Sequence, residues 1–211
     1  MNSYTETFAS WNKVAKLYND KFMKLDIYNY TYDAFCTEVH EENPTILEIG
    51  CGPGNITQYL LKKRPDFILE GIDVAPNMIE LAKSNNPSAH FSVMDCRSIN
   101  TIKNQFNGIV CGFCLPYLSE EDGIKLLEDC NHLLANNGTI YLSFVEGDYA
   151  QSGFKKGSSG DRMYFYYHNL NQLKQWFLQA GYSISNIFKV NYEKNDAGLE
   201  VHTVVIAKKT K

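Results

Sequence analysis

The stretch that decides the fold is Ile46-Leu47-Glu48-Ile49-Gly50-Cys51-Gly52-Pro53-Gly54-Asn55-Ile56-Thr57. It begins as a short apolar run typical of a buried strand, alternating glycines break the run, and apolar residues then recur at helical spacing. Glycine accepts a positive φ and lets a ligand approach the backbone, and the first turn of a helix offers free N–H groups. The stretch therefore predicts a ligand-binding turn at the carboxyl end of a strand, where open α/β sheets bind their ligands.

The spacing of the glycines separates two classes of ligand. Dinucleotide-binding domains prefer G-x-G-x-x-G, and Asn55 stands where that pattern needs its third glycine. Gly50, Gly52 and Gly54 instead form G-x-G-x-G, with the acidic Glu48 two residues ahead. This pattern resembles the first motif of the class I S-adenosylmethionine (SAM)-dependent methyltransferases. The resemblance implies SAM as the cofactor, and an NAD-dependent oxidoreductase is the alternative from another enzyme class.

Two acidic residues follow the next two predicted strands. Asp73 ends the strand at 67–72, about twenty residues after Gly54, a spacing that places a carboxylate on ribose hydroxyls; the alternative is that Asp73 caps the next helix. By the resemblance, Asp95 and Cys96 contact the adenine, and the alternative is an acid in a surface loop. The cofactor-binding residues that the resemblance implies are Tyr18, Glu48, Gly50, Cys51, Gly52, Gly54, Asp73, Val74, Asp95, Cys96 and Gly112.

Residues 1–43 precede the first core strand and predict two helices, because aromatic and apolar residues recur there at helical spacing. The first of them resembles a helix that closes over the SAM pocket in small-molecule methyltransferases. Tyr18 is therefore expected at the cofactor, and residues 1–43 are expected to form a helical lid or cap. The alternative for both helices is simple packing against the sheet.

The acceptor side of the site has no comparable motif. By the resemblance, the end of the strand at 106–112 faces the transferable methyl group. A general base is needed only if the acceptor atom carries a proton, and the candidates are Tyr117, Glu146 and His168. Cys111 and Cys114 form a C-x-x-C pair, but Cys111 lies in an apolar strand and no second pair completes a zinc site. We expect no bound metal.

Strands and helices alternate through most of the chain, which predicts a doubly wound, mostly parallel α/β sheet. Asn137 and Gly138 are expected to end the helix that Ser119 caps. Residues 147–161 are rich in glycine and serine and predict a long flexible loop, followed by an aromatic strip at 163–168. Segments 182–192 and 199–207 predict a hairpin joined by residues 193–198.

The resemblance implies a seven-stranded sheet whose last strand is antiparallel, with helices on both faces and N-terminal helices over the cofactor pocket. It implies a methyltransferase core at 44–211 within a single domain overall. The chain has 211 residues, enough to bury one core. In such a fold the protein mainly positions a nucleophile for in-line displacement of the methyl group.

Composition and net charge limit the kinds of partner that the protein is expected to bind. The formal net charge is −4, so no global field attracts nucleic acid or an anionic membrane. Six cysteines in mostly apolar contexts are typical of reduced thiols in a cytoplasmic protein. We therefore predict a cytoplasmic SAM-dependent methyltransferase acting on a small molecule, as a monomer or homodimer, without nucleic-acid or membrane partners. A SAM-binding protein without catalysis is the further alternative, because its cofactor motifs would look the same.

Overall fold

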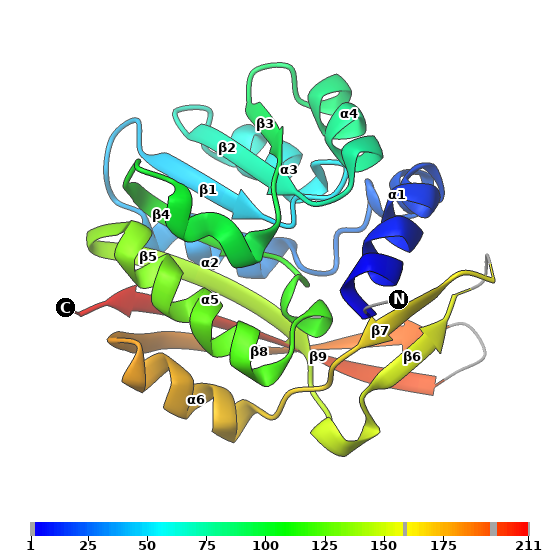
Figure 1. The fold of residues 1–211 in the computed structure, drawn as a ribbon. Helices are drawn as coiled ribbons and strands as arrows, with labels where there is room; N and C mark the ends of the chain where they lie inside the picture. The colour runs from blue at the N-terminus through cyan, green and yellow to red at the C-terminus, as the bar shows by residue number, and fades with distance from the viewer. Residues whose placement is uncertain (1–2, 158–159, 195–197, 211) are drawn as a thin grey trace.

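The computed structural model describes residues 3–157, 160–194 and 198–210. Figure 1 shows a central sheet with helices packed on it. The helices are α1 (Ser3–Phe22), α2 (Asn29–Glu38), α3 (Asn55–Lys63), α4 (Pro76–Asn85), α5 (Glu120–Leu133) and α6 (Leu170–Gln179), with short 3-10 turns η1 (Cys96–Thr101), η2 (Leu115–Tyr117) and η3 (Tyr149–Gln151). The strands are β1 (Thr45–Ile49), β2 (Ile68–Asp73), β3 (His90–Val93), β4 (Phe106–Cys111), β5 (Leu134–Val145), β6 (Gly153–Lys156), β7 (Arg162–Phe165), β8 (Tyr182–Lys194) and β9 (Gly198–Lys209).

The main sheet has seven strands in the order β3-β2-β1-β4-β5-β9-β8. The first five pair in parallel, because a helix or 3-10 turn returns the chain to the same edge after each strand. β9 lies antiparallel to both β5 and β8. The predicted seven-stranded sheet with its last strand antiparallel is confirmed. Of the predicted turn between the last two strands, residues 195–197 lie outside the described residues.

Two apolar layers cover the faces of this sheet. One joins α2 and α3 to the strands, for example Phe35 and Leu60 against Ile46. The other joins η1, α5 and α6 to the opposite face, for example Leu127 and Phe177. Figure 1 shows α5 and α6 in front of the sheet and α2 behind it. Burial on both faces explains why the central strands β1 and β4 are mostly apolar.

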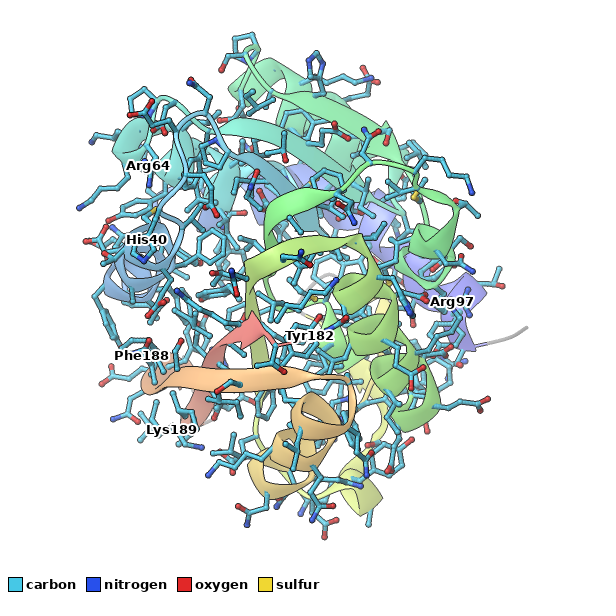
Figure 2. The ribbon with its side chains drawn as sticks, turned by 90° about the vertical axis from the view of Figure 1, so that its left-hand side faces the viewer. His40, Arg64, Arg97, Tyr182, Phe188 and Lys189 are labelled. Carbon is cyan, nitrogen blue, oxygen red and sulfur yellow. The ribbon has the colours of Figure 1, made fainter. Side chains whose placement is uncertain are left out.

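The N-terminal helices pack differently from each other. α1 lies beside β7 at the carboxyl edge of the parallel strands (Figure 1), where Arg162 of β7 pairs with Glu6. α2 instead belongs to the layer on the sheet face, and Arg64 at the end of α3 donates to the carbonyls of Cys36 and Val39 there (Figure 2). Of the expected lid at 1–43, α1 is thus the helix that lies over the carboxyl edge.

Two local expectations were wrong. Residues 147–161 contain η3 and β6 where a flexible loop was predicted, and β6 pairs with β7 in a two-stranded antiparallel hairpin; residues 158–159 lie outside the described part. Asn137 and Gly138 do not end α5, which stops at Leu133. They lie within β5, where Asn137 has φ 62° and the register with β4 shifts. An asparagine with positive φ suits a bulge as well as a helix end.

Within the described ranges, no helix is both long enough and apolar enough to cross a membrane.

Candidate active site

The glycine turn after β1 is tied to the end of β2. The amides of Gly50 and Cys51 both donate to the Ile72 carbonyl, at 2.8 and 3.0 Å. Gly50 and Gly52 have φ of 68° and 52°, a conformation that other residues rarely adopt. A Cβ on Gly50 would lie 3.0 Å from the Cβ of Cys114, whereas one on Gly52 would meet only the edge of the Tyr18 ring, at 3.8 Å. The turn therefore presents bare backbone toward α1.

A cavity of about 1010 Å³ opens between this turn, α1, the hairpin β6–β7 and the ends of β8 and β9. Ligand pockets typically range from about 300 to 1,000 Å³, so this one has room for a cofactor and a second molecule. It brings together most of the residues that the sequence predicted. Those in its wall are Tyr18, Glu48, Gly50, Cys51, Gly52, Asp73, Val74, Asp95, Cys96, Gly112 and Tyr117. Gly54 lies next to the wall, as the residue before α3.

Asp73 fastens the turn and also faces the cavity. Its Oδ2 accepts from the Gly52 amide and its Oδ1 from the Ala75 amide, both at 2.9 Å. Burial raises the pKa of Asp73, and the backbone amides of Ala75, Gly52 and Val74 counter part of that shift. Each carboxylate oxygen has two acceptor sites, so the amides leave capacity for the two hydroxyls of a ribose.

Glu48 is a buried carboxyl group with spare hydrogen-bonding capacity. Its Oε2 accepts from the Thr57 hydroxyl at 2.5 Å. Its Oε1 is buried and has no hydrogen-bond partner among the described residues. Burial raises the pKa of Glu48 to about 8. A buried acceptor in a cavity wall is costly unless a ligand supplies the donor.

Asp95 and Cys96 stand at the start of η1. The Asp95 carboxylate accepts from the Arg97 amide and forms an ion pair with the Arg97 guanidinium. Burial alone would raise the pKa of Asp95, but the hydrogen bonds from Arg97 outweigh it and lower the pKa. The guanidinium lies 4.0 Å from the centre of the Tyr4 ring of α1. Asp95 is thus held in the cavity wall by a cation that also contacts α1.

Among the three candidate bases, Tyr117 is the one that lines the cavity. Its ring packs edge-on against Trp11 at 5.3 Å and against Phe165 at 5.8 Å, and burial raises its pKa. Glu146 lies outside the described cavity wall, where it pairs with Lys189 and accepts from Thr203. His168 is also outside it. Its Nε2 lies 3.2 Å from the carbonyl oxygens of both Leu115 and Leu118, and burial lowers its pKa.

The cavity wall also contains residues that sequence reasoning missed. Tyr28 comes from the segment before α2, Tyr192 from β8, and Glu200 and His202 from β9. The available signal was the spacing of Glu200 and His202, two residues apart in a predicted strand, which places both on one face. Nothing in the sequence said that β9 would lie next to β5, with this face toward the cavity.

Comparison with known sequences identifies the same chemistry. A family model described as a methyltransferase domain matches residues 46–138. The methyltransferase-like protein 235L of Invertebrate iridescent virus 6 is 28% identical over 200 residues, covering 87% of this chain and 73% of that protein. The tRNA N(3)-methylcytidine methyltransferase trm141 of Schizosaccharomyces pombe is 21% identical over 88% of this chain and 84% of its own. The chain spans 50% of the release factor glutamine methyltransferase of Streptococcus pneumoniae, with 57% of this chain aligned at 29% identity.

Solved structures share the fold. Magnesium protoporphyrin IX methyltransferase from Synechocystis, with bound SAM, superposes with a TM-score of 0.72 at 14% identity over 100% of this chain and 98% of its own. The 1,6-didemethyltoxoflavin-N1-methyltransferase of Burkholderia thailandensis gives 0.70 at 17% identity over 99% of this chain and 87% of its own. The sheet order, the glycine turn and these matches agree: residues 46–138 match a methyltransferase domain, and the chain has the fold of the class I SAM-dependent methyltransferases, with SAM as its cofactor.

Proposed function

We propose that this protein transfers the methyl group of SAM to a small-molecule acceptor by in-line displacement. The observation that carries the proposal is the second half of the cavity. Beyond the glycine turn and Asp73, its wall continues over aromatic side chains of α1, β7 and β8, such as Trp11, Phe165 and Tyr192. Aromatic walls with a few polar groups are typical of small-molecule sites.

The residues of the first half fit SAM. Asp73 would hold the ribose, Asp95 and Cys96 the adenine, and Glu48 the cationic amino acid end. Bound SAM supplies a methyl group on a positively charged sulfur. The protein then orients the acceptor and excludes water, and such positioning can contribute about 7–11 kcal/mol to the lowering of the barrier. The aromatic faces around the cavity would also stabilise the positive charge.

The relatives leave the acceptor class open. One relative is named as an enzyme of tRNA and another as an enzyme of a protein, whereas the toxoflavin enzyme has a small molecule bound. We favour the small molecule for this chain because the acceptor half is a walled cavity and not an open basic surface. We also place the enzyme in the cytoplasm, whose reducing conditions suit six free cysteines. Monomer or homodimer remains our expectation.

The test is a methyl-transfer assay with three acceptor pools. The purified protein is first shown to bind SAM by calorimetry. It is then incubated with methyl-labelled SAM and with a low-molecular-weight metabolite extract, total tRNA or total protein. We expect label in the metabolite pool, and Asp73→Ala should reduce that label. Label only in tRNA or protein would contradict the small-molecule proposal.

A further inference from the structure

A hydrogen-bonded chain of three side chains reaches the acceptor half of the cavity. The Tyr28 hydroxyl oxygen lies 2.6 Å from Nδ1 of His202, and Nε2 of His202 lies 3.4 Å from Oε2 of Glu200. All three residues line the cavity. Tyr28 and His202 are buried, with 5% and 7% of their surface exposed. Any further polar contact of these side chains is therefore made with the protein or with a molecule in the cavity.

The chemistry of the three groups fixes the position of the protons. A carboxylate only accepts, so the hydrogen bond to Glu200 places the proton of the neutral imidazole on Nε2. Nδ1 is then an acceptor, and the Tyr28 hydroxyl donates to it. The phenolic oxygen of Tyr28 keeps acceptor capacity for a further donor, such as the hydroxyl group of a bound molecule.

Aromatic rings surround the hydrogen-bonded side chains of Tyr28 and His202. The Tyr192 ring stacks on the His202 ring with centroids 4.9 Å apart and planes at 13°. The Phe113 ring lies 4.9 Å from His202 and 5.2 Å from Tyr28. Phe113 follows β4 and Gly112, and it has φ 55°, which is strained for an aromatic residue. Such strain is often retained at functional positions, and here it accompanies a ring in the cavity wall that contacts both Tyr28 and His202.

We propose that Tyr28 and His202 take the proton from a hydroxyl group of an aromatic acceptor, with Glu200 positioning the imidazole. This inference rests on the proposed function and names the acceptor class. The acceptor hydroxyl passes its proton to the Tyr28 oxygen, and the Tyr28 proton moves to Nδ1 of His202. The electron pair of the broken O–H bond stays on the acceptor oxygen as the nucleophile. The imidazolium that forms lies beside the Glu200 carboxylate.

The competing explanation is structural, since the same bond ties the segment before α2 to β9. His202→Asn separates the two roles. Asparagine can keep a hydrogen-bonding group near the position of Nδ1 but cannot take up a proton. If His202 has only a structural role, His202→Asn should change stability and little else. If His202 takes up the proton, His202→Asn should also abolish ionisation of the bound acceptor.

The experiment uses 4-nitrophenol, which absorbs at a different wavelength when it is ionised. The protein is saturated with S-adenosylhomocysteine and titrated with the phenol at a pH below the phenol's own pKa in water. We expect the bound phenol to show the phenolate band in the wild type. His202→Asn and Tyr28→Phe should still bind the phenol but lose the band, and Glu200→Gln should weaken it. His90→Gln, an exposed residue on β3, is the matched control and should leave the band unchanged.

Two further measurements complete the test. Affinity for S-adenosylhomocysteine, measured by calorimetry, should be the same in all variants as in the wild type. A wild type that does not bind S-adenosylhomocysteine would contradict the proposed function itself. Transfer of labelled methyl to 4-nitrophenol should fall about 100-fold or more in His202→Asn, in kcat rather than in KM, as for a general base. The inference is overturned if the wild type binds no phenol, binds it without the band, or if His202→Asn shows the wild-type band.

Discussion

Glu48 and Asp73, at the ends of neighbouring strands, are two acidic groups whose pKa values burial raises. Asp95 behaves in the opposite way because Arg97 stands beside it. Within the described ranges, neither Glu48 nor Asp73 forms an ion pair with a cationic side chain, and a cationic ligand would stabilise their charged forms. SAM carries positive charge on its sulfur and on its amino group, so the charge of the cavity complements that of the cofactor.

The first prediction concerns Glu48→Gln. The pKa of Glu48 is about 8 in the folded protein against an ordinary 4.5. Between these values the unfolded chain releases a proton that the folded protein keeps, so stability is full below the lower value and is lost as the pH rises through the upper one. The wild type should lose about 4 kcal/mol of stability between about pH 5 and 8 from this group alone, and the variant should not.

Urea unfolding of both proteins across that range checks this prediction. The quantity to compare is the difference between the two free energies of unfolding, because other groups contribute equally to both. Glu80→Gln, with an exposed side chain on α4, is the control. A constant difference between wild type and Glu48→Gln would show that Glu48 does not keep its proton.

The second prediction concerns Asp73→Ala. In the proposed function Asp73 holds the ribose, so removing the carboxylate would delete that charge-assisted contact. It would also leave the Gly52 amide without its acceptor. SAM affinity should fall by about 1.5–3 kcal/mol, measured by calorimetry. Glu80→Ala on the outside of α4 serves as the control. Unchanged affinity in Asp73→Ala would remove this residue from the cofactor site.

The sequence predicted the site residues that lie in the glycine turn and at the ends of the parallel strands. The G-x-G-x-G spacing and the acids after the next two strands were enough to predict Gly52, Asp73 and Asp95 in one wall, because the carboxyl ends of parallel strands meet at one edge. Tyr28 and His202 could not be predicted as site residues from the sequence. They are 174 positions apart, and their meeting depends on β9 being inserted beside β5.

At the scale of elements, α1 is the part whose role can be tested most directly. It is tied to β7 by the bond from Ser10 to the Arg162 carbonyl and to α4 by the bond from Asn77 to the Asn12 carbonyl. Its inner face, with Trp11 and Tyr18, lines the cavity. A helix held mainly by the elements on either side of a cavity is suited to open and close over it.

The third prediction follows from the position of the two tryptophans. Trp11 lines the cavity, whereas Trp176 is buried in the layer of α5 and α6. Binding of SAM should therefore change the fluorescence of Trp11 and protect α1 from trypsin. Trp176→Phe should keep the fluorescence change and Trp11→Phe should lose it. Equal cleavage of α1 with and without saturating SAM would show that this helix is only packing.

The hairpin β6–β7 shows why some elements could not be predicted. Its sequence is rich in glycine, serine and lysine, and three of the four residues of β6 are exposed. Local propensity therefore favoured a loop. The strand forms because β7 is held against α1, where the Tyr164 amide donates to Thr7, and tertiary contacts of this kind override propensity.

At the scale of the whole molecule, the distribution of charge favours a small-molecule acceptor over a nucleic acid. The chain has a net charge of −4. Its tightest basic cluster, Lys62-Lys63-Arg64, is partly neutralised, because Lys63 pairs with Asp33 and Arg64 with Asp66. Lys155 of β6 lies 5.3 Å from the Tyr167 ring. Nucleic-acid affinity depends on neutralising several phosphates at once, and these groups offer little for that.

The fourth prediction is that the protein does not bind RNA or DNA tightly. In a gel-shift titration at low salt, tRNA and single-stranded DNA should show no complex at micromolar protein. Lys155→Glu should change nothing in that assay. A micromolar complex that weakens as salt is added would instead favour an acceptor like that of the tRNA-modifying relative.

The position of β9 has a consequence for how the chain is made. β8 is synthesised first, yet it reaches the sheet only through β9, which lies between it and β5. While the ribosome is still adding β9, the edge of β5 is unpaired and β8 has no neighbour in the sheet. Because the chain is made from its N-terminus, the residues of the glycine turn leave the ribosome long before those of β9. The wall that contains His202 comes last, so a nascent chain can hold the cofactor-binding motif before it has a place for the acceptor.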